Sequence, residues 1–375
     1  MFLKTPPMGW NTWNTFGKNI DEKLILETAD AMVANGLKDA GYEYLVIDDC
    51  WSNKQRDANG NLMTDPVRFP HGLKYLADYI HSKGLKFGIY SCCGPLTCEA
   101  YPGSLDHEYQ DAKFFADNEV DYLKYDWCFH PRNLAGWTLY NRMRMALNAT
   151  GRNIVFSICN WSEEGSFEWV NKVGGDLFRS GGDIFDGIES IKGIVYRQMP
   201  LLCFSGPGCY NDMDMLICGM YGKGNVSHNG GCNDAQYDTH FKLWCMSSTP
   251  LMIGCDIRNM DEFTKKLLTN KEYIAINQDP EQRPPMVVKT DSRYIVLFKH
   301  LSNGEYALSV SNFTDGEVHA NVILPEIGFP ADGQWVLRLH DIDTGEEIGD
   351  IAEGFNINVE PWATRIFKGK IVKVR

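Results

Sequence analysis

The chain has 375 residues, more than one hydrophobic core usually supports, and this length predicts one large domain with a smaller one. Its composition, 44% hydrophobic and 23% charged, is that of an ordinary globular protein. The formal net charge is −13 and the cations form no block, which argues against nucleic acid and anionic membranes as partners, because both bind clustered cations.

The N-terminal residues, Met-Phe-Leu-Lys-Thr-Pro-Pro, contain no apolar export segment. No stretch reaches the roughly 20 apolar residues that a membrane span requires. We therefore expect a cytoplasmic protein, or a secreted or periplasmic one if a signal peptide has been removed. The 12 cysteines form no paired Cys-x-x-Cys units, which disfavours a structural zinc site. A homo-oligomer is possible.

Short β-rich runs alternate with longer amphipathic segments up to about residue 280, a pattern typical of βα units around a parallel sheet. The predicted strands are residues 8–13, 44–51, 86–93, 122–128, 154–161, 177–184, 211–217 and 251–256. The predicted helices are residues 21–36, 73–83, 106–118, 134–148, 187–197, 234–246 and 261–268. Such an alternation of eight strands with helices predicts a (β/α)₈ TIM barrel. The alternative, an open doubly wound sheet, lacks its Gly-x-Gly-x-x-Gly turn here.

Prolines between residues 280 and 285 disfavour a continuing helix, and we predict a domain boundary there, with a catalytic barrel over 1–283 and a second domain over 284–375. The second domain contains short alternating runs at 294–299, 306–311, 318–324 and 335–339. Turn signals such as Asn303-Gly304 and Asp315-Gly316 separate these runs at roughly ten-residue spacing. This pattern predicts a C-terminal antiparallel β-sandwich.

The fourth predicted strand ends in charged residues. Lys124 and Asp126 share one face of it, whereas Leu123 and Tyr125 share the other. In a parallel barrel both charged groups emerge at the C-terminal mouth, where such barrels place their chemistry. We interpret Asp126 as a catalytic nucleophile and expect Lys124 to lower its pKa. A structural ion pair at a strand end is the alternative.

Aromatic and charged residues, together with two cysteines, also gather at the ends of the other predicted barrel strands. They are Trp10, Trp13, Asp48, Asp49, Trp51, Tyr90, Cys93, Cys159, Trp161, Arg179, Asp183, Asp212 and Asp214. Each tryptophan alone is more often a core residue. Together, aromatic faces and carboxylates match a sugar site, because rings stack on the apolar face of a pyranose and carboxylates accept hydrogen bonds from its hydroxyls.

Glycosidic cleavage needs a second carboxyl group that carries a proton, and Asp183 is the candidate acid. Arg179 should lower the pKa of Asp183, which argues against this role unless the arginine points at substrate. Paired carboxylates at 48/49 and 212/214 could hold a divalent cation in principle. The histidines show no metal-ligand spacing, however, and we expect neither a metal nor another cofactor.

These residues lie in stretches that resemble the family-27 glycoside hydrolases, the α-galactosidase or melibiase family of clan D. The matching stretches are residues 6–13, 44–51, 68–72, 84–90, 121–128, 206–208, 211–216 and 275–280. They span the predicted barrel in the family's order, whereas the C-terminal domain carries little signature. The resemblance implies a retaining exo-glycosidase that acts on terminal α-linked galactose, with α-galactoside substrates as its partners.

The resemblance also implies roles for individual residues. Asp126 falls on the family's nucleophile and Asp183 on its acid/base, and Asp48 and Asp49 fall on carboxylates that bind the galactose 4- and 6-hydroxyls. The other expected substrate-binding residues are Trp13, Tyr90, Lys124, Cys159, Trp161, Arg179 and Asp214. Cys98 and Cys128 match a disulfide beside the site, although disulfides are uncommon in the cytosol.

Two features of the chain bear on specificity within this family. Cys50 matches a cysteine that in animal members pairs with one near the first strand, and no cysteine precedes residue 50 here. Cys159 and Trp161 resemble the plant and microbial loop, which disfavours a substrate with an acetamido group. The alternatives are an α-N-acetylgalactosaminidase, a β-L-arabinopyranosidase or a non-catalytic sugar-binding barrel.

Overall fold

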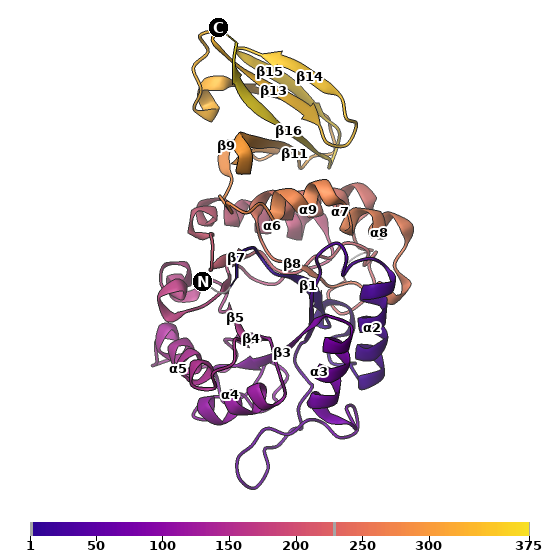
Figure 1. Ribbon diagram of the computed structural model, residues 1–375, viewed down its shortest axis with the longest axis vertical. Coiled ribbons are helices and arrows are strands. Elements are labelled where there is room, and N and C mark those ends of the chain that lie inside the picture. Colours follow the sequence, from indigo (N-terminus) through magenta and orange to yellow (C-terminus); the bar gives the residue numbers. More distant parts are fainter. Residues whose placement is uncertain (1–2, 228–229, 375) are drawn as a thin grey trace.

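The computed structural model describes residues 3–227 and 230–374, which form a barrel with a smaller β-domain stacked on its side (Figure 1). The barrel strands are β1 (Met8–Asn11), β2 (Tyr44–Ile47), β3 (Lys86–Cys92), β4 (Tyr122–Asp126), β5 (Val155–Cys159), β6 (Leu177–Arg179), β7 (Tyr210–Asp212) and β8 (Leu251–Ile253). They pair in parallel in the order β7-β6-β5-β4-β3-β2-β1-β8.

The ring closes just after β7. Leu216 there donates its N–H to the carbonyl of Met252 on β8 at 2.7 Å, and Gly254 donates to the carbonyl of Leu216 at 2.9 Å. Because these bonds join the two end strands, the sheet has no open edge in this register. The predicted (β/α)₈ barrel is confirmed.

The helices lie outside the ring of strands. They are α1 (Trp13–Phe16), α2 (Glu22–Ala34), α3 (Gly72–Ser82), α4 (Glu108–Asp117), α5 (Gly136–Ala149), α6 (Ile188–Gln198), α7 (Asp234–Ser247), α8 (Glu262–Leu268) and α9 (Lys271–Asn277). Amphipathic spacing explains their packing: α3 buries Leu73, Leu76, Ala77 and Ile80, which lie on one face of the helix. Between β5 and β6 the chain forms two short 3₁₀ helices, η1 (Glu163–Glu168) and η2 (Val170–Val173).

All eight predicted barrel strands exist, but each ends earlier than predicted. The strand predicted over 44–51 ends at Ile47, and the one predicted over 177–184 ends at Arg179. After Ile47 the chain leaves the ladder because its backbone N–H groups turn to carboxylates: Asp49 donates to Asp48 Oδ1 at 3.0 Å and Cys50 donates to Asp49 Oδ1 at 2.7 Å. Asp48, Asp49 and Asp183 therefore lie on loops, whereas Lys124 and Asp126 lie on β4.

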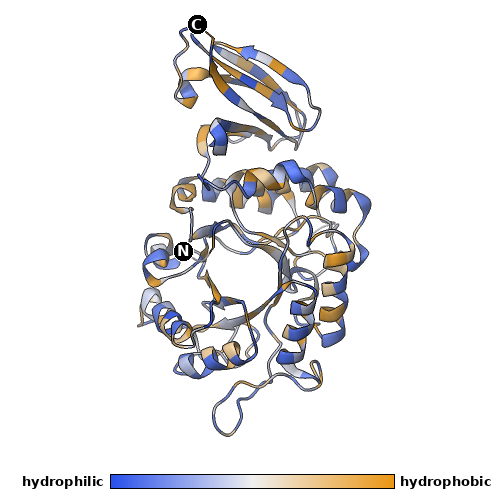
Figure 2. Ribbon diagram, in the orientation of Figure 1, coloured by the Kyte–Doolittle hydropathy of each residue, from blue (hydrophilic) through white to orange (hydrophobic). Residues whose placement is uncertain are grey.

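The C-terminal part folds as two antiparallel sheets that pack face to face. Its strands are β9 (Met286–Thr290), β10 (Tyr294–His300), β11 (Glu305–Asn312), β12 (Val318–Ile323), β13 (Trp335–Asp341), β14 (Glu347–Ile351), β15 (Gly354–Val359) and β16 (Thr364–Lys373). Six strands form one sheet, and β12 and β15 form the other. Apolar and polar residues alternate along these strands (Figure 2), and the apolar ones fill the space between the sheets. The predicted antiparallel β-domain is confirmed.

The sandwich lies against the side of the barrel that carries α6, α7 and α9 (Figure 1). Lys242 on α7 binds the carbonyl of Thr364 at 2.9 Å and the carboxylate of Asp343 at 2.7 Å. The boundary predicted between residues 283 and 284 falls between α9 and β9, and it stays a prediction. In the part of the chain that the structure describes, no helix is long and apolar enough to cross a membrane.

Candidate active site

One pocket at the C-terminal ends of the barrel strands contains every residue predicted to be catalytic or to bind substrate. It is lined by Trp13, Asn14, Asp48, Asp49, Tyr90, Cys98, Lys124, Asp126, Cys159, Trp161, Arg179, Asp183, Asp214, Met215 and Val226. Sequence reasoning missed Asn14, Met215 and Val226. Asn14 and Met215 directly follow predicted site residues, whereas Val226 lies in the long segment between β7 and α7 and carries no sequence signal.

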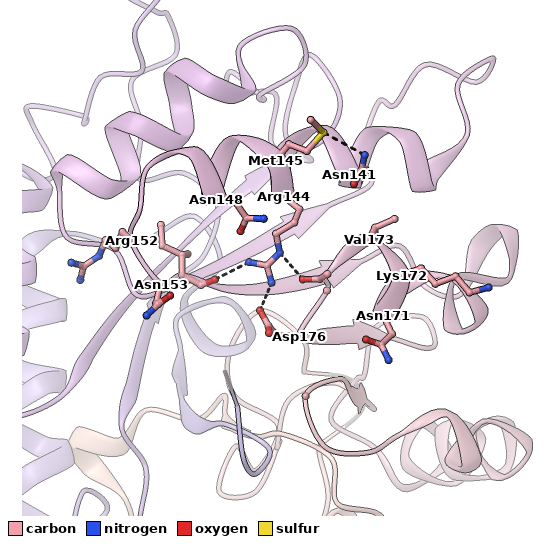
Figure 3. A pocket seen from close by; sticks show the side chains of 14 residues that line it. Asn141, Arg144, Met145, Asn148, Arg152, Asn153, Asn171, Lys172, Val173 and Asp176 are labelled. Atoms are coloured by element: carbon pink, nitrogen blue, oxygen red, sulfur yellow. Dashed lines mark hydrogen bonds and ion pairs between the residues drawn. The ribbon is translucent and has the colours of Figure 1, made fainter. Parts of the chain in front are cut away.

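A wider pocket lies at the opposite end of the barrel, near the N-terminal ends of β5 and β6 (Figure 3). Its central guanidinium, that of Arg144, binds the carboxylate of Asp176 at 2.7 Å and the carbonyl of Gly174 at 2.6 Å. The charge of this arginine is thus balanced within the fold. Active sites of such barrels occupy the C-terminal end, and the chemistry is therefore sought in the pocket around Asp126.

The carboxylate of Asp126 is held on both of its oxygens. Tyr90 donates its hydroxyl to Oδ2 at 2.8 Å, and the Trp127 N–H donates to Oδ1 at 2.8 Å. Only 5% of Asp126 is exposed. Leu123 and Tyr125 point the other way and are buried in the core, as the strand alternation predicts.

Lys124 pairs with Asp48 rather than with Asp126. Its Nζ donates to Asp48 Oδ2 at 2.9 Å, and the Asn11 side chain donates to the same oxygen at 2.8 Å. Although burial acts to lower it, the carboxylates of Asp48 and Asp126 hold the pKa of Lys124 well above its usual range. Lys124 is therefore a charged group inside the barrel mouth.

The expectation that the pKa of Asp126 is lowered is wrong. Burial raises the pKa of Asp126 more than the charge of Lys124 and the two hydrogen bonds lower it. The physical reason is that the carboxylate loses its hydration while the nearest full positive charge is engaged by Asp48.

Arg179 joins the candidate acid to a second carboxylate. Its guanidinium lies 3.1 Å from Asp183 Oδ1 and 3.0 Å from Asp214 Oδ1. Partial burial acts to raise the pKa of Asp183, but Arg179 and then Lys124 outweigh it, so that this pKa lies below its ordinary value. Asp183 is also the more open of the two candidate catalytic groups, with 54% of its side chain exposed.

Two further carboxylates in the pocket have raised pKa values. Burial raises the pKa of Asp49 to about 6, although the N–H groups of Glu99 and Cys50 donate to it at 3.0 and 2.7 Å. Burial likewise raises the pKa of Asp214 to about 6, against the lowering effect of Arg179. The pocket thus concentrates carboxylates whose protonation changes in mildly acidic solution.

A disulfide borders the pocket. Cys98, after β3, is bonded to Cys128, after β4, as the family resemblance implies. The Tyr90 hydroxyl that donates to Asp126 lies 3.5 Å from Cys98 Sγ. Cys50 is buried and unpaired, in line with the missing cysteine near the first strand.

A pocket of this kind, at the mouth of a parallel barrel with aromatic walls and two carboxyl groups in different surroundings, has the components needed to cleave a glycosidic bond. Fold and site together define a barrel glycoside hydrolase. A family model described as alpha galactosidase A (Melibiase_2) matches residues 5–279. The chain belongs to this family, the α-galactosidases of glycoside hydrolase family 27.

Individual relatives agree with this assignment. The chain is 49% identical over 277 residues to alpha-galactosidase 3 of Arabidopsis thaliana, a match that covers 74% of this chain and 61% of that protein. It is 40% identical to alpha-galactosidase 2 of the same plant over 97% of this chain and 89% of the relative. The crystal structure of alpha-galactosidase I from Mortierella vinacea superposes with a TM-score of 0.90 at 32% identity, covering 98% of this chain and 97% of that one.

Proposed function

We propose that the chain hydrolyses terminal α-linked galactose from oligosaccharides or glycoconjugates by a retaining mechanism, with Asp126 as nucleophile and Asp183 as acid/base. The observation that carries the proposal is the pocket itself. It contains a buried carboxylate held by Tyr90 and Trp127 and a more open carboxylate beside Arg179, in a chain whose relatives are α-galactosidases.

In the first step, a carboxylate oxygen of Asp126 forms a bond to the anomeric carbon. The bond from that carbon to the leaving oxygen breaks, and Asp183 gives its proton to that oxygen. In the second step, Asp183 takes a proton from water, the resulting hydroxide oxygen displaces Asp126, and α-galactose leaves. Two inversions at the same carbon retain its configuration.

The free site disfavours the protonation state that the first step needs. Turnover requires Asp126 ionised and Asp183 protonated, whereas burial raises the pKa of Asp126 and Arg179 helps to lower that of Asp183. The ionised fraction of Asp126 falls as the pH drops, and the protonated fraction of Asp183 falls as the pH rises. We therefore expect an acidic activity range in which only a small fraction of the free enzyme carries both groups in the required state.

The charged groups at the strand ends and the aromatic side chains of the pocket wall would recognise the sugar. Asp48, Asp49 and Lys124 offer two acceptors and a donor for the hydroxyl edge of galactose, and they are already positioned by contacts among themselves and with the backbone. Trp13 and Tyr90 serve as walls. By the family resemblance, Cys159 and Trp161 would lie near the 2-hydroxyl of the sugar, which disfavours an acetamido group there.

The proposal is tested by following 4-nitrophenyl α-galactoside hydrolysis by proton NMR. α-Galactose should appear first and mutarotate later to the β anomer, whereas β-galactose as the first product would contradict retention. The matching α-N-acetylgalactosaminide and β-L-arabinopyranoside separate the rival specificities: a higher kcat/KM on either one would replace galactose as the substrate. Galactose binding without any turnover would favour the non-catalytic barrel.

A further inference from the structure

Two glycines separate Asp183 from the end of β6, which is held by the Ser180 N–H bond to the carbonyl of Asp212 at 3.2 Å. Gly181 and Gly182 precede the carboxylate, and a Cβ added at Gly182 would meet no atom within 4 Å. Glycines there leave the backbone conformationally free. Besides its ion pair with Arg179, the orientation of Asp183 therefore depends on what holds the residues that follow it.

Asp186, three residues further on, is the most strongly held residue of this segment. Its side chain is fully buried, and Oδ2 accepts the Gly222 N–H at 2.7 Å. Oδ1 accepts the Cys232 N–H at 3.1 Å and the Tyr237 hydroxyl at 2.8 Å. Three donors that converge on one buried carboxylate make a strong, charge-assisted anchor.

The anchor joins Asp186 to the segment between β7 and α7, which also shapes the pocket. The Asp186 N–H donates to the carbonyl of Val226 at 2.9 Å, and Val226 lines the pocket. The Val226 N–H in turn donates to the carbonyl of Asn14, another pocket residue, at 3.1 Å. Asp186 thus links the acid/base segment to the part of the pocket wall that Val226 and Asn14 form.

The packing around the carboxylate leaves no room for adjustment. A Cβ added at Gly231 would lie 2.5 Å from Asp186 Oδ2 and 2.1 Å from the Gly222 nitrogen. Gly222 and Gly231 also have φ values of 72° and 76°, a region that favours glycine. These two glycines allow the backbone to approach Asp186 closely enough to donate to it.

We propose that Asp186 is a positioning residue, which holds Asp183 over the pocket by anchoring the segment after β6 to the segment between β7 and α7. This inference rests on the proposed role of Asp183 as acid/base. Asp186 does not line the pocket and would not contact the sugar. Its effect would come through the placement of the proton donor, where a shift of about 1 Å can cost on the order of a hundredfold in rate.

The test compares Asp186→Asn with the wild type on two α-galactosides, one with a 2,4-dinitrophenyl leaving group and one with a methyl leaving group. Asparagine keeps the size of the side chain but offers only one acceptor, so that a backbone donor loses its partner. Only the methyl glycoside needs a well-placed acid. We expect its kcat/KM to fall roughly tenfold more than that of the dinitrophenyl substrate.

A matched control separates positioning from general loss of stability. Asp176, before β6, is also a buried carboxylate that accepts a backbone N–H, that of Phe156 at 2.9 Å, but it lies at the far end of the barrel (Figure 3). Asp176→Asn should lose stability without changing the ratio between the two substrates. Tyr237→Phe removes one donor to Asp186 and should shift the ratio in the same direction by less.

The outcomes distinguish this inference from the proposed function. A wild-type protein with no activity on either substrate would overturn the proposed function. An active wild type whose substrate ratio is unchanged by Asp186→Asn and by Tyr237→Phe would overturn the positioning role alone. If Asp186→Asn does not fold, the ratio in Tyr237→Phe decides the matter. As a second readout, the acid limb of kcat/KM, which follows the lower pKa of Asp183, should move to higher pH, because a loosened Asp183 departs from Arg179.

Discussion

At the scale of single residues, the carboxylate of Asp126 receives a hydrogen bond from the Tyr90 hydroxyl and another from the Trp127 N–H. Both bonds favour its ionised form, whereas its burial favours the protonated form. Because burial and hydrogen bonds act on the pKa of Asp126 in opposite directions, the loss of a single donor should change it.

Tyr90→Phe should therefore raise the pKa of Asp126 further. Since the pKa of Asp126 lies above that of Asp183, the alkaline limb of kcat/KM follows Asp126. This limb should move to higher pH by about one to two units while the maximum falls, given that a hydrogen bond to a charged group contributes roughly 1.5–3 kcal/mol. The pH profile of kcat/KM measures this shift directly.

Tyr140→Phe is the control for this change. The Tyr140 hydroxyl is also buried but has no hydrogen-bond partner among the described residues. Its removal should leave the alkaline limb where it is. An unshifted limb in Tyr90→Phe would contradict the role of the Tyr90 hydroxyl.

At the scale of elements, the barrel strands could be predicted because each is a short apolar run between helical segments. The ends of the strands could not. Beyond Ile47 and Arg179 the backbone bonds to side chains and distant loops instead of to a neighbouring strand: the Ile184 N–H, for example, donates to Asp214 Oδ2 at 2.8 Å. Asp214 itself has a φ of 82°, outside any strand.

Which side chains share a strand face was predictable, but which ones pair across the barrel was not. Period-two alternation places Lys124 and Asp126 together. The partner of Lys124, however, is Asp48, from the loop after β2, with β3 between their strands. The family resemblance supplied the Cys98–Cys128 pairing, for which the spacing of the cysteines holds no information.

The strands of the C-terminal domain were likewise predicted only in part. The predicted runs correspond to β10, β11, β12 and β13, whose alternation is clear. Four further strands, β9 and β14 to β16, were missed. β14 is largely exposed, with the pattern Glu-Ile-Gly-Asp-Ile, and it forms through pairing with β13 rather than through burial of its own side chains.

At the scale of the whole molecule, the barrel and the sandwich share a buried amine. Lys299 on β10 is fully buried and donates to the carbonyl of Ile276 on α9 at 2.8 Å and to the hydroxyl of Ser248. Burial lowers its pKa to about 7, although Asp279 and Cys245 act in the opposite sense. The two folding units are thus joined through a group that titrates near neutrality.

This lysine should make stability depend on pH. Between about pH 7 and 10 the unfolded chain binds one proton more than the folded one at this site, so its contribution to the free energy of unfolding rises with pH, by up to about 1.4 kcal/mol per unit. Lys299→Met removes the titration. Urea unfolding measures the free energy of unfolding of both proteins at pH 7 and pH 9. The value for the wild type should increase relative to that of the variant at the higher pH. An equal difference at both pH values would contradict the lowered pKa.

The central claim, that Asp126 is the nucleophile, is tested most directly by trapping the galactosyl-enzyme. In Asp183→Ala, 2,4-dinitrophenyl α-galactoside needs no acid to react, whereas the second step lacks its base, so the ester should accumulate. Peptide mapping by mass spectrometry should then locate a hexosyl group on Asp126. A hexosyl group on another carboxylate, such as Asp48 or Asp214, or turnover at the wild-type rate without any adduct, would contradict the assignment.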